Sequence, residues 1–377
     1  MTDSRIARKL LLLCDYHSGL LDSLSETLDQ IPVGERFFIR KRDRSEWRSK
    51  NNHVITLPLR VFKEQDGLHL TSILSTAAYL LTASLVGIIL VLRNRVDIVL
   101  GIFGFPQGFA SMLIGKITHR KIGVLTDGGD IDVLLRNVLV RPLMLMSLRK
   151  ADAVAALNRP KANQLLALGI EAHISTTFGV DTSRFRYVPI DRKHKWLILY
   201  VGRLSSEKSL ETLLKACRKL HRAGVGFQLA IVGDGPLRPE IMDIAAQAGL
   251  ADILTIEGYV PHSKIHEFFQ KAAIFVLPSI REGTSVSLLE AMSSGCVCIT
   301  SDIPDNIEII QHMRTGITFR VGDDEDLANK LNWVISHPSK LARITRNARD
   351  KAEKEYSLQA VADSLVPLLP RVDRASA

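Results

Sequence analysis

One stretch of the chain joins a buried run of apolar residues to a helix through a short polar turn. The apolar run, Ile274 to Leu277, predicts a buried strand. The stretch from Pro278 to Gly295 follows it, with Gly283, Thr284 and Ser285 in the turn and a helical pattern after them. A strand that leads directly into a helix is the building block of parallel α/β sheets, so the chain is expected to contain such a sheet.

Two carboxylates, Glu282 and Glu290, stand eight positions apart in this stretch. At a helical rise of about 1.5 Å per residue they are roughly 10–12 Å apart. The helix N-terminus between them has free N–H groups and a dipole that suit a phosphate. The spacing therefore fits a nucleotide diphosphate with one polyol at each end, each held by one carboxylate. The alternative is a Glu in a loop followed by an unrelated, exposed helical Glu.

A second motif pairs a glycine turn with two cations. Leu197 to Val201 predicts a strand, and Gly202, Arg203 and Lys208 follow it, with the two cations five positions apart. An Arg fork and a Lys point charge at this spacing suit a diphosphate. The alternative is a lysine-rich helix start.

The whole chain alternates strand-like and helical segments. This pattern predicts an α/β fold with two Rossmann-like units, each a parallel sheet with helices on both faces. Ligands bind beyond the carboxyl ends of parallel strands, which places the expected site in a cleft between the two sheets. The main strand-like runs are residues 10–14, 96–100, 122–125, 151–156, 197–201, 228–232, 254–256, 274–277 and 296–300.

Several motifs together resemble the retaining glycosyltransferases of family 4, which have the GT-B fold. The stretch with Glu282 and Glu290 resembles the E-x7-E signature of that family. The resemblance is strongest over residues 196–335, moderate over 96–190 and weak over 1–95. Further matching segments are the cation motif above, Gly233-Asp234-Gly235-Pro236, Glu257-Gly258-Tyr259-Val260-Pro261 and Phe178-Gly179-Val180-Asp181.

The resemblance implies a role for each matching residue. Glu282 would face the donor sugar, Glu290 would hold the ribose, and Arg203 and Lys208 would bind the diphosphate as catalytic cations. The other substrate-binding positions it implies are Gly202, Gly258, Tyr259, Val260, Gly283, Thr284 and Ser285. No metal and no cofactor are expected, and the nucleotide sugar is the donor substrate.

The segment from Asp127 to Asp130 departs from the family pattern. The family has His-Gly-x-Asp there, with the His close to the donor sugar, and here Asp127 stands at the His position while Asp130 matches. We expect Asp127 to be catalytic and Asp130 to bind substrate. Asp130 and Asp132 also form a short D-x-D match to metal sites of the other glycosyltransferase fold, which is too short to predict a metal.

The expected domain division follows from these motifs. Residues 1–190 would form the acceptor-side domain and residues 191–355 the nucleotide-sugar domain. Residues 356–377 would form a C-terminal helix and tail that cross back to the first domain.

The implied activity is metal-independent, hexosyltransferase-like transfer of a sugar to an acceptor hydroxyl with retention. A sugar or lipid-linked acceptor in glycolipid or cell-surface polysaccharide synthesis is expected. One alternative is a nucleotide-sugar epimerase or hydrolase of the same fold. The other is a membrane subunit that binds nucleotide sugar without turnover.

The charge distribution points to a membrane. The formal net charge is +9; residues 1–192 hold 26 Lys and Arg against 18 Asp and Glu, and residues 193–377 hold 23 against 22. A basic surface attracts anionic membranes or nucleic acid, and no nucleic-acid module is recognisable. Four scattered cysteines and no secretion signal favour the cytoplasm, at the inner face of the cell membrane.

Three segments could contact that membrane. Residues 70–92 contain 23 residues without a charge, which fits a packed or membrane-facing helix and, by length alone, a transmembrane span. Residues 133–150 combine apolar residues with arginines, and Pro142 should break them into two helical pieces; the alternative is a buried helix with snorkelling arginines. Residues 36–50 form a basic cluster, which fits either lipid headgroups or a solvated strand and loop.

Overall fold

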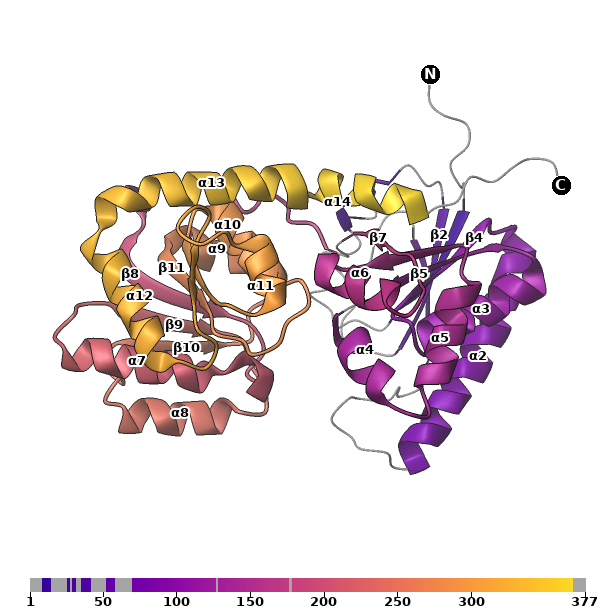
Figure 1. Cartoon of the computed structure of the whole chain (residues 1–377), viewed down its shortest axis with the longest axis horizontal. Helices are drawn as coiled ribbons and strands as arrows, with labels where there is room; N and C mark the ends of the chain where they lie inside the picture. The colour runs from indigo at the N-terminus through magenta and orange to yellow at the C-terminus, as the bar shows by residue number, and fades with distance from the viewer. Residues whose placement is uncertain are drawn as a thin grey trace, which may run out of the picture. The chain divides into compact units, whose positions relative to one another are not determined.

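The computed structural model describes residues 9–14, 26–27, 29–31, 35–41, 52–57, 70–126, 128–175 and 178–368. The chain forms two compact units, one of Met1–Thr177 with Val361–Ala377 and one of Phe178–Ala360 (Figure 1). Each unit is a parallel sheet with helices packed on it, so the α/β prediction is confirmed in both. We refer to them as the N-terminal and C-terminal units.

The N-terminal unit has a seven-stranded sheet in the order β3-β2-β1-β4-β5-β6-β7, with every pair parallel. Its strands are β1 (Lys9–Cys14), β2 (Glu35–Lys41), β3 (Asn52–Leu57), β4 (Ile98–Ile102), β5 (Lys121–Thr126), β6 (Ala153–Ala156) and β7 (His173–Ile174). Its helices are α2 (Leu70–Asn94), α3 (Gln107–Thr118), α4 (Gly128–Val133), α5 (Arg141–Lys150) and α6 (Arg159–Leu166).

Continuous apolar strands explain the centre of this unit. β1 and β4 are buried along nearly their whole length, as expected where helices cover both faces of a parallel sheet. α2, α3 and α5 lie side by side in contact with the sheet (Figure 1). The predicted break at Pro142 is present, because α5 begins at Arg141 and places the proline in its first turn, where no backbone hydrogen bond is lost.

The C-terminal unit has a six-stranded parallel sheet in the order β10-β9-β8-β11-β12-β13. Its strands are β8 (His194–Val201), β9 (Gln228–Val232), β10 (Leu254–Gly258), β11 (Ala272–Leu277), β12 (Val297–Ser301) and β13 (Ile317–Phe319). Its helices are α7 (Leu210–Arg222), α8 (Arg238–Gln247), α9 (His262–Lys271), α10 (Val286–Ser294), α11 (Pro304–Ile309), α12 (Asp324–Ser336), α13 (Pro338–Tyr356) and α14 (Leu358–Leu365), the last of which continues into the N-terminal unit.

The strand order creates a topological switch point between β8 and β11. The chain goes from β8 through β9 to β10 on one side and then returns to place β11 on the other side of β8. The connections before and after the switch leave on opposite faces of the sheet, so a crevice opens at the carboxyl ends of β8 and β11. The position of this crevice follows from the strand order alone.

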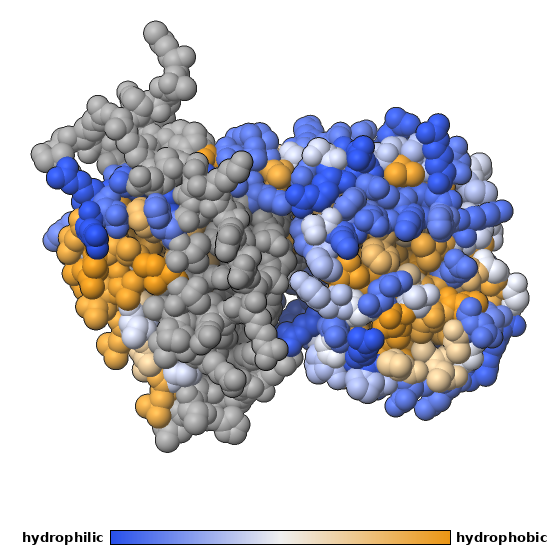
Figure 2. All heavy atoms as spheres, turned by 180° about the vertical axis from the view of Figure 1, so that it is seen from behind, coloured by the Kyte–Doolittle hydropathy of each residue, from blue (hydrophilic) through white to orange (hydrophobic). Residues whose placement is uncertain are grey.

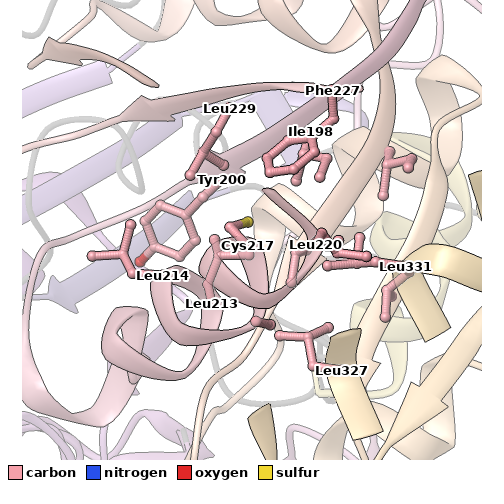
Figure 3. Packing of buried hydrophobic residues seen from close by; sticks show 14 of the residues in the cluster. Ile198, Tyr200, Leu213, Leu214, Cys217, Leu220, Phe227, Leu229, Leu327 and Leu331 are labelled. Atoms are coloured by element: carbon pink, nitrogen blue, oxygen red, sulfur yellow. The ribbon is translucent and has the colours of Figure 1, made fainter. Parts of the chain in front are cut away.

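Amphipathic helices complete the core of the C-terminal unit. Figure 3 shows Ile198 and Tyr200 of β8 packed against Leu213, Cys217 and neighbouring leucines of α7. Tyr200 is fully buried, although it carries a hydroxyl that needs a partner.

The boundary between the units lies at residues 177 and 178 and not at 190 as expected. Val180 and Phe185 pack into the core of the C-terminal unit with β11 and α10. Arg349 of α13 donates hydrogen bonds to the carbonyls of Thr182 and Phe185. Sequence motifs mark where a pattern ends, whereas packing decides to which unit a linking segment belongs.

Candidate active site

The turns at the carboxyl ends of β8, β9 and β10 are joined by backbone hydrogen bonds. Gly202 N donates to Val232 O at 3.0 Å, and Gly233 N donates to Gly258 O at 2.8 Å. A Cβ on Gly233 would lie 1.9 Å from Gly202 O, and the Gly233 φ of +138° also disfavours any side chain. Glycine is therefore required where these two turns meet.

Lys208 and Glu282 meet at the switch point. Lys208 belongs to the short 3-10 turn after β8 (Ser206–Lys208), and Glu282 lies in the loop after β11. Lys208 Nζ donates to Glu282 Oε1 at 2.6 Å, and Ser279 Oγ donates to the same oxygen at 2.6 Å. The Glu282 side chain is 7% exposed and the Lys208 side chain 20% exposed. Glu282 is therefore a buried, ion-paired carboxylate, unlike an ordinary solvent-exposed loop glutamate.

A hydrogen-bond network holds this carboxylate in place. The Ser301 hydroxyl at the end of β12 donates to Ser279 O, and the Asn306 side-chain amide donates to Ser301 O and Oγ, both at 3.1 Å. Ile280 N donates to Glu207 O at 2.9 Å, which ties the loop after β11 to the turn after β8. The two motifs are therefore one structural unit.

The turn after β8 contains three charged side chains, those of Arg203, Glu207 and Lys208. Arg203 is exposed, and Tyr200 Oη donates to its carbonyl at 2.9 Å. Burial, with the negative charges of Glu282 and Glu207, raises the pKa of Tyr200 well above its usual value, so the hydroxyl stays a donor. Burial alone would raise the pKa of Glu207, but hydrogen bonds from Ser205 and from the backbone, with nearby Lys208 and Arg203, hold it below its usual value.

Glu290 lies in the second turn of α10 and is 3% exposed. His262 Nε2, at the start of α9, is 2.6 Å from Glu290 Oε1, and the His262 ring lies 5.9 Å from the Phe185 ring. The alternative of an unrelated, exposed helical glutamate is therefore wrong. The expected ribose role of Glu290 stays a prediction, now with His262 as the group that orients the carboxylate.

The helix start between the two glutamates is open to an anion. α10 begins at Val286 with Ser285 at its N-cap position, and its first turn contains no acidic residue. The Ser285 side chain makes no capping hydrogen bond to this turn, and Gly283 and Thr284 are partly exposed. Backbone N–H groups at such a helix start suit a phosphate.

The segment expected to contact the base follows β10. Gly258 is buried with a φ of +71°, Tyr259 is 68% exposed, and Val260 is partly buried. Gly258 is joined to Gly233, which places this segment at the same edge of the sheet as the cation motif. Contact with a base stays a prediction.

In the N-terminal unit, Asp127 lies outside the described residues. Asp130 is 2% exposed, and its Oδ2 accepts from Gly104 N at 2.7 Å, so it holds the loop after β4. Both Asp132 oxygens accept from Lys161 Nζ at 2.7 Å. Within the described part of the chain, no group of three or more His, Cys, Asp and Glu is placed to hold a metal ion. The D-x-D carboxylates have structural partners of their own.

Sequence reasoning missed two residues of this region, Ser279 and His262. Ser279 lies two residues after the end of β11 and is fully buried, a position at which a hydroxyl needs a partner. That position could have suggested its role. His262 is 28 positions from Glu290, and no local spacing connects them.

Comparison with known proteins shows which proteins the chain is similar to. Residues 182–351 match the family model described as glycosyl transferases group 1. The chain is 28% identical over 290 residues to the putative colanic acid biosynthesis glycosyltransferase WcaL of Escherichia coli, covering 73% of this chain and 70% of that protein. It is 27% identical to the amylovoran biosynthesis glycosyltransferase AmsK of Erwinia amylovora, covering 75% and 73%.

A solved structure extends the likeness to the complete fold. HepE of Anabaena, solved in complex with UDP, matches with a TM-score of 0.73 at 16% identity, covering 96% of this chain and 99% of that chain. The fold of the chain is accordingly GT-B, with two doubly wound parallel sheets in succession. By the matched family model over residues 182–351 and by the relatives above, the chain is similar to the group 1 glycosyltransferases.

Proposed function

We propose that the protein transfers a hexose, with retention of anomeric configuration, from a nucleoside diphosphate sugar to an acceptor hydroxyl. The observation that carries the proposal is the Lys208–Glu282 pair at the switch point, 2.6 Å apart and held by Ser279. It places a cation and an oriented carboxylate where a GT-B sheet opens its crevice.

In the proposed reaction, the bond between the anomeric carbon and the diphosphate oxygen breaks, and its electron pair goes to that oxygen. The acceptor oxygen forms the new bond to the anomeric carbon and gives its proton to the departing phosphate. Lys208, Arg203 and the N–H groups at the start of α10 stabilise the negative charge as it develops. Glu282 accepts hydrogen bonds from donor-sugar hydroxyls, because an ionised carboxylate can only accept.

The two cations support a metal-independent reaction. A divalent metal would neutralise the diphosphate, and Arg203 and Lys208 supply that charge from the protein. We expect turnover to persist in EDTA, and loss of turnover in EDTA with recovery on adding Mg²⁺ or Mn²⁺ would contradict this part of the proposal.

The acceptor is proposed from the relatives. WcaL and AmsK are named for the biosynthesis of colanic acid and amylovoran. We infer an acceptor in cell-surface polysaccharide or glycolipid synthesis, used at the cytoplasmic face of the membrane.

The experiment combines a donor screen with an acceptor assay. Thermal shift with UDP, GDP and ADP sugars identifies the donor, starting with UDP-glucose because HepE was solved with it. The donor with a radiolabelled sugar is then incubated with lipid and polysaccharide extracts. Label transferred to an extract supports the proposal. Free sugar or an epimer with every acceptor would indicate a hydrolase or epimerase, and binding without any turnover would indicate a non-catalytic subunit.

A further inference from the structure

One face of α2 exposes a continuous stripe of large aliphatic residues. At about 100° per residue, the five positions fall within roughly 80° of arc around the helix and extend over about 27 Å. The stripe consists of Leu74, Leu81, Leu85, Ile89 and Leu92, which are 60%, 74%, 62%, 54% and 63% exposed. Figure 2 shows hydrophobic residues gathered along one side of the N-terminal unit.

The opposite face of α2 is part of the core. Tyr79, Ala83 and Val91 are fully buried and pack with β1, β4 and α3. A Cβ on Gly87 would lie 2.4 Å from the Ile114 side chain of α3, so the two helices are in close contact. Residues 74–94 of α2 are apolar enough and long enough to cross a membrane. In a membrane-spanning position, however, the buried face of the helix would lose its contacts with the sheet. The structure therefore favours a helix that packs on the sheet with its outer face uncovered among the described residues.

Basic residues lie at one end of the stripe. α2 leads into β4 and α3 leads into β5, and these strands are parallel, so both helices end at the same edge of the sheet. Arg93 and Arg95 at the end of α2 are exposed, as is Lys116 at the end of α3. Residues 70–126 contain five Lys and Arg but only one carboxylate, Asp97. Asp97 Oδ2 accepts a hydrogen bond from Lys9 N at 2.9 Å.

We propose that the stripe and this basic end bind an anionic lipid bilayer, with α2 lying in the plane of the interface. Apolar side chains beside cations suit the acyl and headgroup layers of such a membrane. A symmetric dimer through the same face with the two α2 helices parallel would bring the like charges of two copies together, and dimer formation is one of the outcomes that the test below distinguishes. The inference rests on this surface and not on the donor chemistry proposed above.

The test is flotation of the full chain with vesicles of phosphatidylcholine, with and without phosphatidylglycerol. We expect flotation with phosphatidylglycerol, weakened by salt. Leu81→Glu should lower the vesicle partition coefficient about tenfold or more, and Arg93→Gln with Arg95→Gln about fivefold or more. Leu166→Glu on α6 is the matched control, because Leu166 is 59% exposed on another helix of the same unit. The vesicle partition coefficient of this variant should equal that of the wild type.

Several outcomes would overturn the inference. One is equal flotation of wild type and Leu81→Glu, and another is no binding of wild type to either vesicle. A dimer in light scattering that Leu81→Glu dissociates would show that the face joins two copies. If the protein stays in cell membranes during extraction with alkaline carbonate, α2 spans the bilayer. Circular dichroism confirms that each variant folds, and Leu81→Glu should keep the wild-type affinity for the nucleoside diphosphate in solution.

Discussion

Removing the Lys208 side chain tests the diphosphate assignment most directly. Lys208→Ala takes away a cation 2.6 Å from Glu282 Oε1 and leaves the carboxylate with Ser279. If Lys208 stabilises the departing diphosphate, turnover should fall about 10²–10³-fold, equivalent to about 2.7–4 kcal/mol of transition-state stabilisation. The loss should appear in turnover of the donor and in affinity for the nucleoside diphosphate.

Loss of the Lys208 side chain should also lower the free energy of unfolding. Breaking a fully buried ion pair by removing one partner costs about 3–5 kcal/mol. Lys208 is 20% exposed and Glu282 7% exposed, so solvent screens part of the pair and we expect roughly 1–3 kcal/mol. In a unit of this size that lowers the melting temperature by roughly 3–9 °C. The fold should therefore survive, and turnover can be measured well below the transition.

A second substitution separates the two roles. Adding Glu282→Gln to Lys208→Ala removes the uncompensated negative charge, so stability should return to within about 1 kcal/mol of wild type. Turnover should stay low, because the cation is still missing. Lys215→Ala is the matched control: Lys215 is an exposed lysine of α7 whose Nζ is 2.6 Å from Glu211, and its loss should change neither quantity.

The assay measures nucleoside diphosphate release from the donor identified by thermal shift, and calorimetry measures nucleoside diphosphate affinity. Wild-type turnover and affinity in Lys208→Ala, together with a lowered melting temperature, would refute the reasoning. The pair would then be structural, and the diphosphate would bind elsewhere.

Three further predictions follow from single contacts. Glu290→Ala should abolish the preference for a nucleoside diphosphate over its 2′-deoxy form in calorimetry, and a preserved preference would contradict the ribose role. Gly233→Ala should cost at least about 3 kcal/mol in chemical denaturation, because its Cβ meets Gly202 O at 1.9 Å; Gly249→Ala, also at positive φ but with nothing within 4 Å, should cost about 1 kcal/mol. The Glu207 pKa is lowered below its ordinary 4.5, so its ionised form stabilises the fold above that pH, and this contribution is lost as pH falls through the folded pKa. Glu207→Gln should flatten the stability–pH profile below about 4.5, and an unchanged profile would contradict the assignment.

Local pattern was sufficient to predict the long, buried strands, whereas β3, β7 and β13 at the edges of the sheets were not among the predicted runs. Apolar runs such as Leu10–Cys14 and Ile274–Leu277 are buried strands, because a strand covered on both faces needs apolar residues throughout. The alternation with helices indicated parallel sheets, and a glycine turn before a helix indicated where an anion could bind. The boundary at residue 190 was wrong because no sequence pattern records which core a linker joins.

The contacts of the candidate site depended on the tertiary structure. Lys208 and Glu282 are 74 positions apart and meet because β8 and β11 are neighbours in the sheet. The same is true of His262 and Glu290, which α9 and α10 bring together. Such pairs arise only when the packing of the whole unit selects one strand order.

The exposed face of α2 shows the same limit. Leu81 and Tyr79 are both apolar, and the sequence of this helix is apolar around its whole circumference, so periodicity predicted a helix without saying which face is buried. Local sequence pattern determined the long strands and helices and the residue types available for phosphate chemistry. Strand order, and with it the pairing of Lys208 with Glu282 and the outward face of α2, was decided by tertiary packing, because these arrangements depend on the free energy of contacts between segments far apart in the chain.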